Sequence, residues 1–240
     1  MMVTAIIRVK PILFKRDTPL KVSKEKAAEN RAALVRAAGI LIRERGIDGV
    51  GVAEISKKAG LTHGALYAQF PSKEALTAEA FAAAAQEGFE EITADRNGRP
   101  ATLTDFLDSY LSVEHRDNLA TSCPMSASAS EIARQDRLVC ERFKEGFEQI
   151  VAVIESRLGT SAVRVDRHQR ALAVMAALIG GVAASRAVAK ADSRLSNEIL
   201  RAVRQIVGEV GGEETHVDGT RGKVRTTRKR ARTSRAAVRK

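Results

Sequence analysis

The segment from residue 52 to residue 70, VAEISKKAGLTHGALYAQF, constrains the fold more than any other part of the chain. Its apolar residues recur three and four positions apart in two short runs, and a glycine separates the runs. This spacing predicts two short helices joined by a tight turn, because glycine adopts the left-handed backbone that ends a helix sharply. The residues expected to form the core and turn of this hairpin are Val52, Ile55, Ala59, Gly60, Leu61, Leu66 and Phe70.

The second predicted helix leaves small and polar side chains on its outer face. With a first helix to brace it, this is the layout of a helix-turn-helix, whose second helix enters the major groove of DNA. An ordinary helical hairpin has the same turn and is the alternative. The expected DNA contacts are Thr62, His63, Gly64, Ala65, Tyr67, Gln69 and Lys73. Among them, His63, Ala65 and Gln69 are candidates for reading bases, while Tyr67 and Lys73 suit phosphates.

Helical patterns continue on both sides of this hairpin. Residues 29–46 form one amphipathic stretch that ends at a glycine, and Ser72 can cap a helix running to about Thr93. In this order the motifs resemble those of the TetR family of bacterial transcriptional regulators, over residues 28–81. The family's turn, recognition helix and next helix start correspond here to Gly60-Leu61-Thr62, Leu66-Tyr67-Ala68-Gln69-Phe70 and Ser72-Lys73-Glu74-Ala75-Leu76. Gln69 stands where histidine is commoner in the family.

Composition favours an all-α fold. Aromatic residues make up 4% of the chain and tryptophan is absent, while 44% of the residues are hydrophobic, which is ample for a packed core. The formal net charge of +11 is concentrated at the two ends, and the body between them is net acidic. A basic end can bind DNA non-specifically or can merely keep the chain soluble, and both interpretations stay open for the C-terminal one.

We expect four segments: a flexible basic arm over 1–23, the helix-turn-helix DNA-binding domain over 24–75, a helical ligand-binding and dimerisation domain over 76–212, and a disordered basic tail over 213–240. Helical periods beyond residue 100 predict helices that begin near Thr102, Pro124, Asp166 and Ser196, with another around residues 143–158. The stretch from Ala171 to Ser185 is apolar and uncharged, yet it is short for a membrane span and favours a buried helix. We therefore expect a cytoplasmic protein that contacts no membrane.

The resemblance implies an inducer cavity among the middle helices and a homodimer formed by the last two. The side chains assigned to the cavity are Phe106, Tyr110, Cys123, Phe143, Phe147 and Met175. Those assigned to the dimer interface are Leu172, Ile179, Ala183, Ile199, Val203 and Ile206. No catalytic constellation, cofactor motif or metal-ligand spacing stands out, so an enzyme is disfavoured and neither cofactor nor metal is expected.

The leading hypothesis is a homodimeric repressor that a small-molecule inducer releases from a palindromic double-stranded DNA operator. A non-specific architectural DNA-binding protein, dominated by its basic ends, is one alternative. The other is a thiol-based redox-sensing repressor that uses Cys123 or Cys140. Two cysteines are too few for a secreted disulfide framework, and each can equally be a small apolar core residue.

Overall fold

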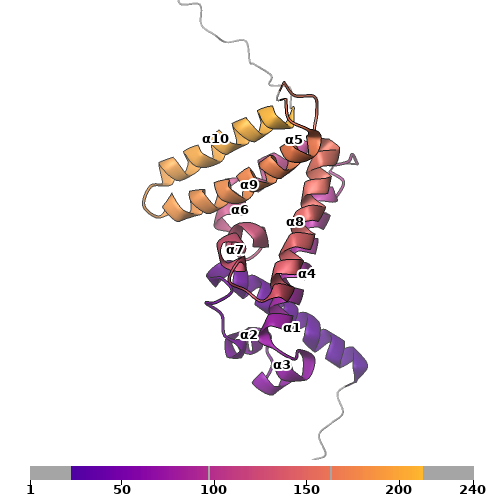
Figure 1. Ribbon diagram of the computed structural model, residues 1–240. Helices are drawn as coiled ribbons and strands as arrows, with labels where there is room; N and C mark the ends of the chain where they lie inside the picture. Colours follow the sequence, from indigo (N-terminus) through magenta and orange to yellow (C-terminus); the bar gives the residue numbers. More distant parts are fainter. Residues whose placement is uncertain (1–22, 97, 163, 213–240) are drawn as a thin grey trace, which may run out of the picture.

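The computed structural model describes residues 23–96, 98–162 and 164–212, and within these ranges it is helical throughout, with no strand (Figure 1). The expected all-α fold is confirmed. The expected arm over 1–23, apart from Ser23, and the expected tail over 213–240 lie outside the described residues. The helices are α1 (Lys24–Arg45), α2 (Val52–Lys58), α3 (His63–Gln69), α4 (Lys73–Thr93), α5 (Leu103–Tyr110), α6 (Val113–Asp117), α7 (Pro124–Ile132), α8 (Arg137–Arg157), α9 (Arg167–Ala189) and α10 (Ser193–Gly211).

Helices α1, α2 and α3 form a compact unit at one end of the molecule (Figure 1). Leu66 and Phe70 from α3 and its C-cap are almost completely buried, together with Ile55 of α2 and Leu34 of α1. Helix α1 begins before Glu29 because the Ser23 side chain accepts a hydrogen bond from the Lys26 N–H at 3.1 Å. These contacts form the three-helix arrangement that a helix-turn-helix requires.

Helix α4 crosses the expected domain boundary at residue 75 without a break. Ser72 caps its first turn by accepting from the Ala75 N–H at 3.2 Å. The first half packs on α1, where Gly39 leaves room for the backbone of Ala80, and the second half packs on α8 beside Gly146. One continuous helix therefore belongs to both the DNA-binding unit and the larger helical domain.

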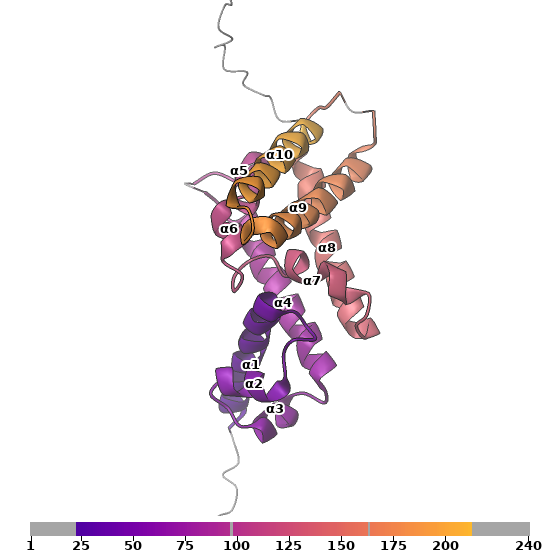
Figure 2. The ribbon, with the colours of Figure 1, turned by 90° about the vertical axis from the view of Figure 1, so that its left-hand side faces the viewer.

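The larger domain is built from α5 to α10 around the second half of α4 (Figures 1 and 2). Thr102 and Asp105 form the expected capping box at the start of α5. Helix α6 was not predicted, because five residues are too few to show a helical period. Helix α10 starts earlier than Ser196 because the Asp192 carboxylate accepts from the Leu195 N–H at 2.9 Å.

Candidate DNA interface and ligand cavity

The outer face of α3 is open to solvent. Thr62, His63, Gly64 and Tyr67 are exposed, and the Tyr67 side chain keeps 48% of its surface accessible. Ala65 and Gln69 are half-buried at the edges of this face. The His63 and Tyr67 rings meet edge to face, with centroids 5.1 Å apart, so they present one continuous surface. Nothing lies within 4 Å of a Cβ built on Gly64, so the start of the helix is free to approach another molecule closely.

Local capping and the turn fix the position of α3. Gly60 takes a φ of +70°, which the sharp turn after α2 requires. The Thr62 hydroxyl accepts from the Ala65 N–H at 3.3 Å, so in this structure it serves as the helix cap. Lys73 donates its Nζ hydrogen bond to the Ile47 carbonyl at 3.0 Å. Its assignment to a DNA phosphate stays a prediction, and that contact would require Lys73 to leave the Ile47 carbonyl.

Arg31 of α1 anchors the C-terminal end of α3, and the sequence reasoning missed it. Its guanidinium donates to the Gln69 carbonyl at 2.5 Å and lies over the Phe70 ring, 4.1 Å from the centroid. The same group forms an ion pair with Glu79 of α4. Arg31 stands on the same helical stripe as the buried Leu34 and Ala38, and a charge on a buried stripe is the signal that could have identified it.

A cavity opens between α4, α5, α8 and the segment that joins α6 to α7. Its volume is about 190 Å³, which is small for a site that binds a drug-sized molecule. Phe106, Tyr110 and Cys123 line it as expected, and Phe143, Phe147 and Met175 do not. Lining residues that sequence reasoning missed include Glu91, Ile92, His115, Ser122, Met125 and Ile150.

Phe143, Phe147 and Met175, which do not line the cavity, pack elsewhere in the helical domain. Phe143 faces Phe81 at a ring-centroid distance of 5.6 Å. Phe147 borders a separate groove between α8 and α9, and Met175 is completely buried. Helical periodicity correctly places them on apolar faces, but it cannot tell which neighbouring helix each face meets.

Tyr110, His115 and Cys123 meet at the inner wall of the cavity. The Tyr110 ring stacks on the His115 ring with centroids 4.6 Å apart, and the Cys123 N–H donates to His115 Nε2 at 3.4 Å. Burial, aided by the nearby Arg186 guanidinium, lowers the pKa of His115 to about 4, so the imidazole is neutral at pH 7. Burial also raises the pKa of Tyr110, with a further contribution from Cys123, so the phenol keeps its proton.

The Tyr110 hydroxyl has no hydrogen-bond partner, and no other buried side-chain nitrogen or oxygen of the described residues shares this condition. The side chains of Cys123 and Ser126 lie close enough to affect the pKa of the hydroxyl, but neither meets it with hydrogen-bond geometry. A buried hydroxyl without a partner costs about 1–3 kcal/mol. The hydroxyl oxygen is itself covered by protein atoms, although the Tyr110 residue lines the cavity.

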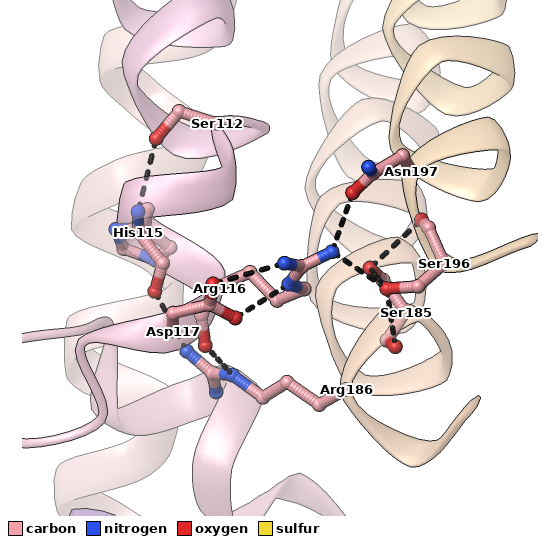
Figure 3. A network of polar contacts seen from close by, with 8 residues as sticks. All are labelled: Ser112, His115, Arg116, Asp117, Ser185, Arg186, Ser196 and Asn197. Carbon is pink, nitrogen blue, oxygen red and sulfur yellow. Dashed lines mark hydrogen bonds and ion pairs between the residues drawn. The ribbon is translucent and has the colours of Figure 1, made fainter. Parts of the chain in front are cut away.

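A polar network behind this wall ties α6 to α9 and α10 (Figure 3). Arg186 of α9 donates to the carbonyls of Arg116 at 2.9 Å and His115 at 3.1 Å, which lie in the last turn of α6. The buried Arg116 in turn donates to Ser196 Oγ and Asn197 Oδ1 of α10, both at 2.7 Å. The cavity wall is thus joined by hydrogen bonds to the last two helices.

Helices α9 and α10 pack on each other, and both lie toward the viewer in Figure 2. We call their solvent-exposed apolar surface the α9–α10 face; its members include Leu172, Ala173, Ala176, Gly180, Ala183, Ala187, Leu195, Ala202 and Ile206. Of the residues assigned to a dimer interface, Leu172, Ala183 and Ile206 belong to it. Ile199 is half-buried, Ile179 lies in the subunit core, and Val203 packs against Gly181 within the subunit.

Among the described helices, α9 alone is long and apolar enough to cross a membrane by length and composition. Only 39% of its most apolar 18-residue window is buried within the subunit. One side of α9 therefore packs in the core of the subunit, while apolar residues on its other side remain exposed.

The family model for "Bacterial regulatory proteins, tetR family" matches residues 34–80, the segment that contains most of α1, all of α2 and α3, and the start of α4. Over these residues the chain is a TetR-family regulatory domain. The matched segment includes the whole exposed face of α3, so the helix-turn-helix predicted from the sequence is the TetR-type DNA-binding domain.

Solved structures share the fold over about three quarters of this chain. NemR of E. coli in its reduced form is 22% identical, with a TM-score of 0.58, and the match covers 75% of this chain and 95% of NemR. A TetR-family regulator from Agrobacterium tumefaciens is 20% identical with a TM-score of 0.60, covering 75% and 98%. One from Chloroflexus aurantiacus is 23% identical with a TM-score of 0.58, covering 76% and 94%. A search of curated proteins found no match.

Proposed function

We propose that the protein is a cytoplasmic, homodimeric repressor whose DNA affinity is lowered by a small molecule bound in the cavity. The observation that carries the proposal is the continuity of α4. Ala84, Ala85 and Ile92 of this helix line the cavity, while its first turn follows the recognition helix directly. A ligand that displaces the second half of α4 would move the recognition helix with it, because a helix transmits displacement along its axis.

Dimerisation would place two copies of α3 in successive major grooves. A two-fold axis at the α9–α10 face leaves the DNA-binding units at the far end of each subunit (Figure 1). The two half-sites would then lie roughly 34–36 Å apart or a little more, on a palindromic operator. A coupling of about 1–3 kcal/mol between ligand and DNA would relieve repression several-fold or more.

Footprinting on the DNA upstream of the protein's own gene tests this function. We expect protection of two half-sites that survives an excess of unrelated DNA and weakens when the correct small molecule is added. If unrelated DNA abolishes all protection, the architectural alternative replaces the repressor. If protection persists but no compound from a broad screen changes it, the regulator is not ligand-responsive.

We propose that a ligand with a hydrogen-bond acceptor displaces the atoms that now cover the Tyr110 hydroxyl and bonds to it, because this hydroxyl has no partner and its residue lines the cavity. We predict that Tyr110→Phe leaves the ligand-free protein as stable as the wild type or up to about 1 kcal/mol more stable, since the change removes an unsatisfied buried group. The same change should weaken ligand binding about tenfold. Thermal unfolding and ligand titration measure the two effects, and a marked loss of stability would show that the hydroxyl is already bonded.

A thiol-sensing repressor is the second candidate, because Cys123 lines the cavity at the N-terminus of α7. We predict that hydrogen peroxide lowers DNA affinity in the wild type and not in Cys123→Ser. Cys140→Ser is the matched control, since Cys140 donates to the Ile132 carbonyl at 3.2 Å and does not line the cavity. Equal peroxide responses in all three proteins, measured by DNA titration, would eliminate thiol sensing.

A further inference from the structure

Helix α7 connects the cavity to the DNA-binding domain. At its N-terminal end, Cys123, Pro124 and Met125 line the cavity. At its other end, Glu131 Oε2 accepts a hydrogen bond from the Ile47 N–H at 2.6 Å. Ile47 lies in the loop between α1 and α2, so a side chain of the ligand domain holds the backbone of the helix-turn-helix. The two ends of α7 are about 13 Å apart, given a rise of about 1.5 Å per residue.

The loop is shaped to receive this carboxylate. Gly46 has a φ of +80°, and a Cβ built on it would overlap the Glu131 carboxylate, so only glycine leaves room for the approach. The Ile47 carbonyl accepts from Lys73 Nζ at 3.0 Å, and therefore both backbone groups of Ile47 are held by charged side chains. Gln135, just beyond α7, adds a second contact by donating to Asp48 Oδ1 at 3.1 Å.

We propose that Glu131 is a positioning residue that couples the cavity to the helix-turn-helix. When a molecule binds in the cavity, α7 moves and Glu131 changes the position of the loop before α2. A group that enters the cavity pushes on the N-terminal turn of α7, and the short rigid helix withdraws the Glu131 carboxylate from Ile47. The released loop then frees α2, and α3 behind it, from the orientation that binds DNA. This inference rests on the proposed function, because it assigns a second route, beside α4, by which the cavity regulates DNA binding.

Hydrogen exchange at the Ile47 amide tests the contact without DNA. In Glu131→Ala the amide loses its charged acceptor, and its exchange should accelerate about tenfold. Glu131→Gln keeps an acceptor of the same shape and should give a smaller increase, which also provides a variant expected to fold normally. Glu141→Ala is the matched control, because Glu141 pairs only with Arg137 on its own helix and should leave Ile47 exchange unchanged. Unchanged exchange in Glu131→Ala would overturn the proposal.

Regulation is tested by filling the cavity covalently. A bromobimane reagent attached to Cys123, in a Cys140→Ser background, serves as the occupant. With Glu131 present, labelling should accelerate Ile47 exchange and weaken binding to the footprinted DNA about tenfold or more. In Glu131→Ala, labelling should weaken DNA binding several-fold less than it does with Glu131 present, because the Glu131 contact is already lost and only α4 still transmits the displacement.

Equal effects of the label on DNA affinity in the two proteins would overturn the role of Glu131 and leave the repressor intact. If the label accelerates Ile47 exchange but the protein shows no preference for any DNA sequence, the proposed function is wrong, whereas the contact between Glu131 and Ile47 is confirmed. The two failures are therefore distinguishable.

Discussion

Ile206→Asp should convert the protein to monomers and reduce operator affinity by on the order of 1,000-fold. Ile206 is the most exposed large apolar side chain of the α9–α10 face, with 57% of its surface accessible in the subunit. In a two-fold interface the substitution would bury an aspartate from each subunit without a partner, which is strongly unfavourable. A monomer then holds one recognition helix and loses the second half-site.

Light scattering and DNA titration measure the two effects. Gln205→Asp is the matched control, because it introduces the same charge one residue earlier, on an exposed side of α10 that does not belong to the apolar face. The subunit fold should survive both changes, since neither side chain lies in the core. A dimer of unchanged stability in Ile206→Asp would show that the subunits meet elsewhere.

Replacing both His63 and Tyr67 by alanine should weaken operator binding on the order of 100-fold, since contacts to DNA are worth about 1–3 kcal/mol each. Both side chains are exposed and contact each other on the outer face of α3, so their loss removes the centre of the predicted interface. The free energy of unfolding should change by less than about 0.5 kcal/mol, because surface substitutions away from the core have small effects.

Gln86→Ala is the matched control, and its operator affinity and free energy of unfolding are measured in the same way. Gln86 is exposed on α4, far along the helix from α3, and bonds only to Glu90 on its own helix. We expect its affinity for the operator to equal that of the wild type. Undiminished binding by the His63 and Tyr67 double variant would require DNA to contact another surface of the protein.

Local patterns in the sequence were sufficient for the helix-turn-helix. Leu66 and Phe70, four residues apart, define the buried side of α3, and Gly60 and Thr62 mark the turn and the cap before it. These features act within a few residues of one another, and the same holds for the capping box at Thr102 and Asp105. Periodicity, caps and turns are properties of neighbouring residues, so they can be read without the tertiary structure.

Contacts between distant residues were decided only by the tertiary structure. The sequence marks Val203 and Ile206 alike as apolar residues of α10, yet Val203 packs on Gly181 inside the subunit while Ile206 faces outward. The cavity assignment from sequence included Phe143 and Phe106 alike, yet of the two only Phe106 lines the cavity.

Glu131 is the strongest example of this limit. Its carboxylate reaches Ile47, 84 residues earlier in the chain, through a gap that Gly46 leaves open. The amphipathic period determines which side of each helix is buried, whereas the packing of α7 against α1 determines which residue it meets there. The sequence by itself therefore determined most of the helices, several of their caps and the DNA-binding unit. The tertiary structure alone decided the walls of the cavity, the uncovered surface and the contact between the two domains, because each depends on how whole helices pack.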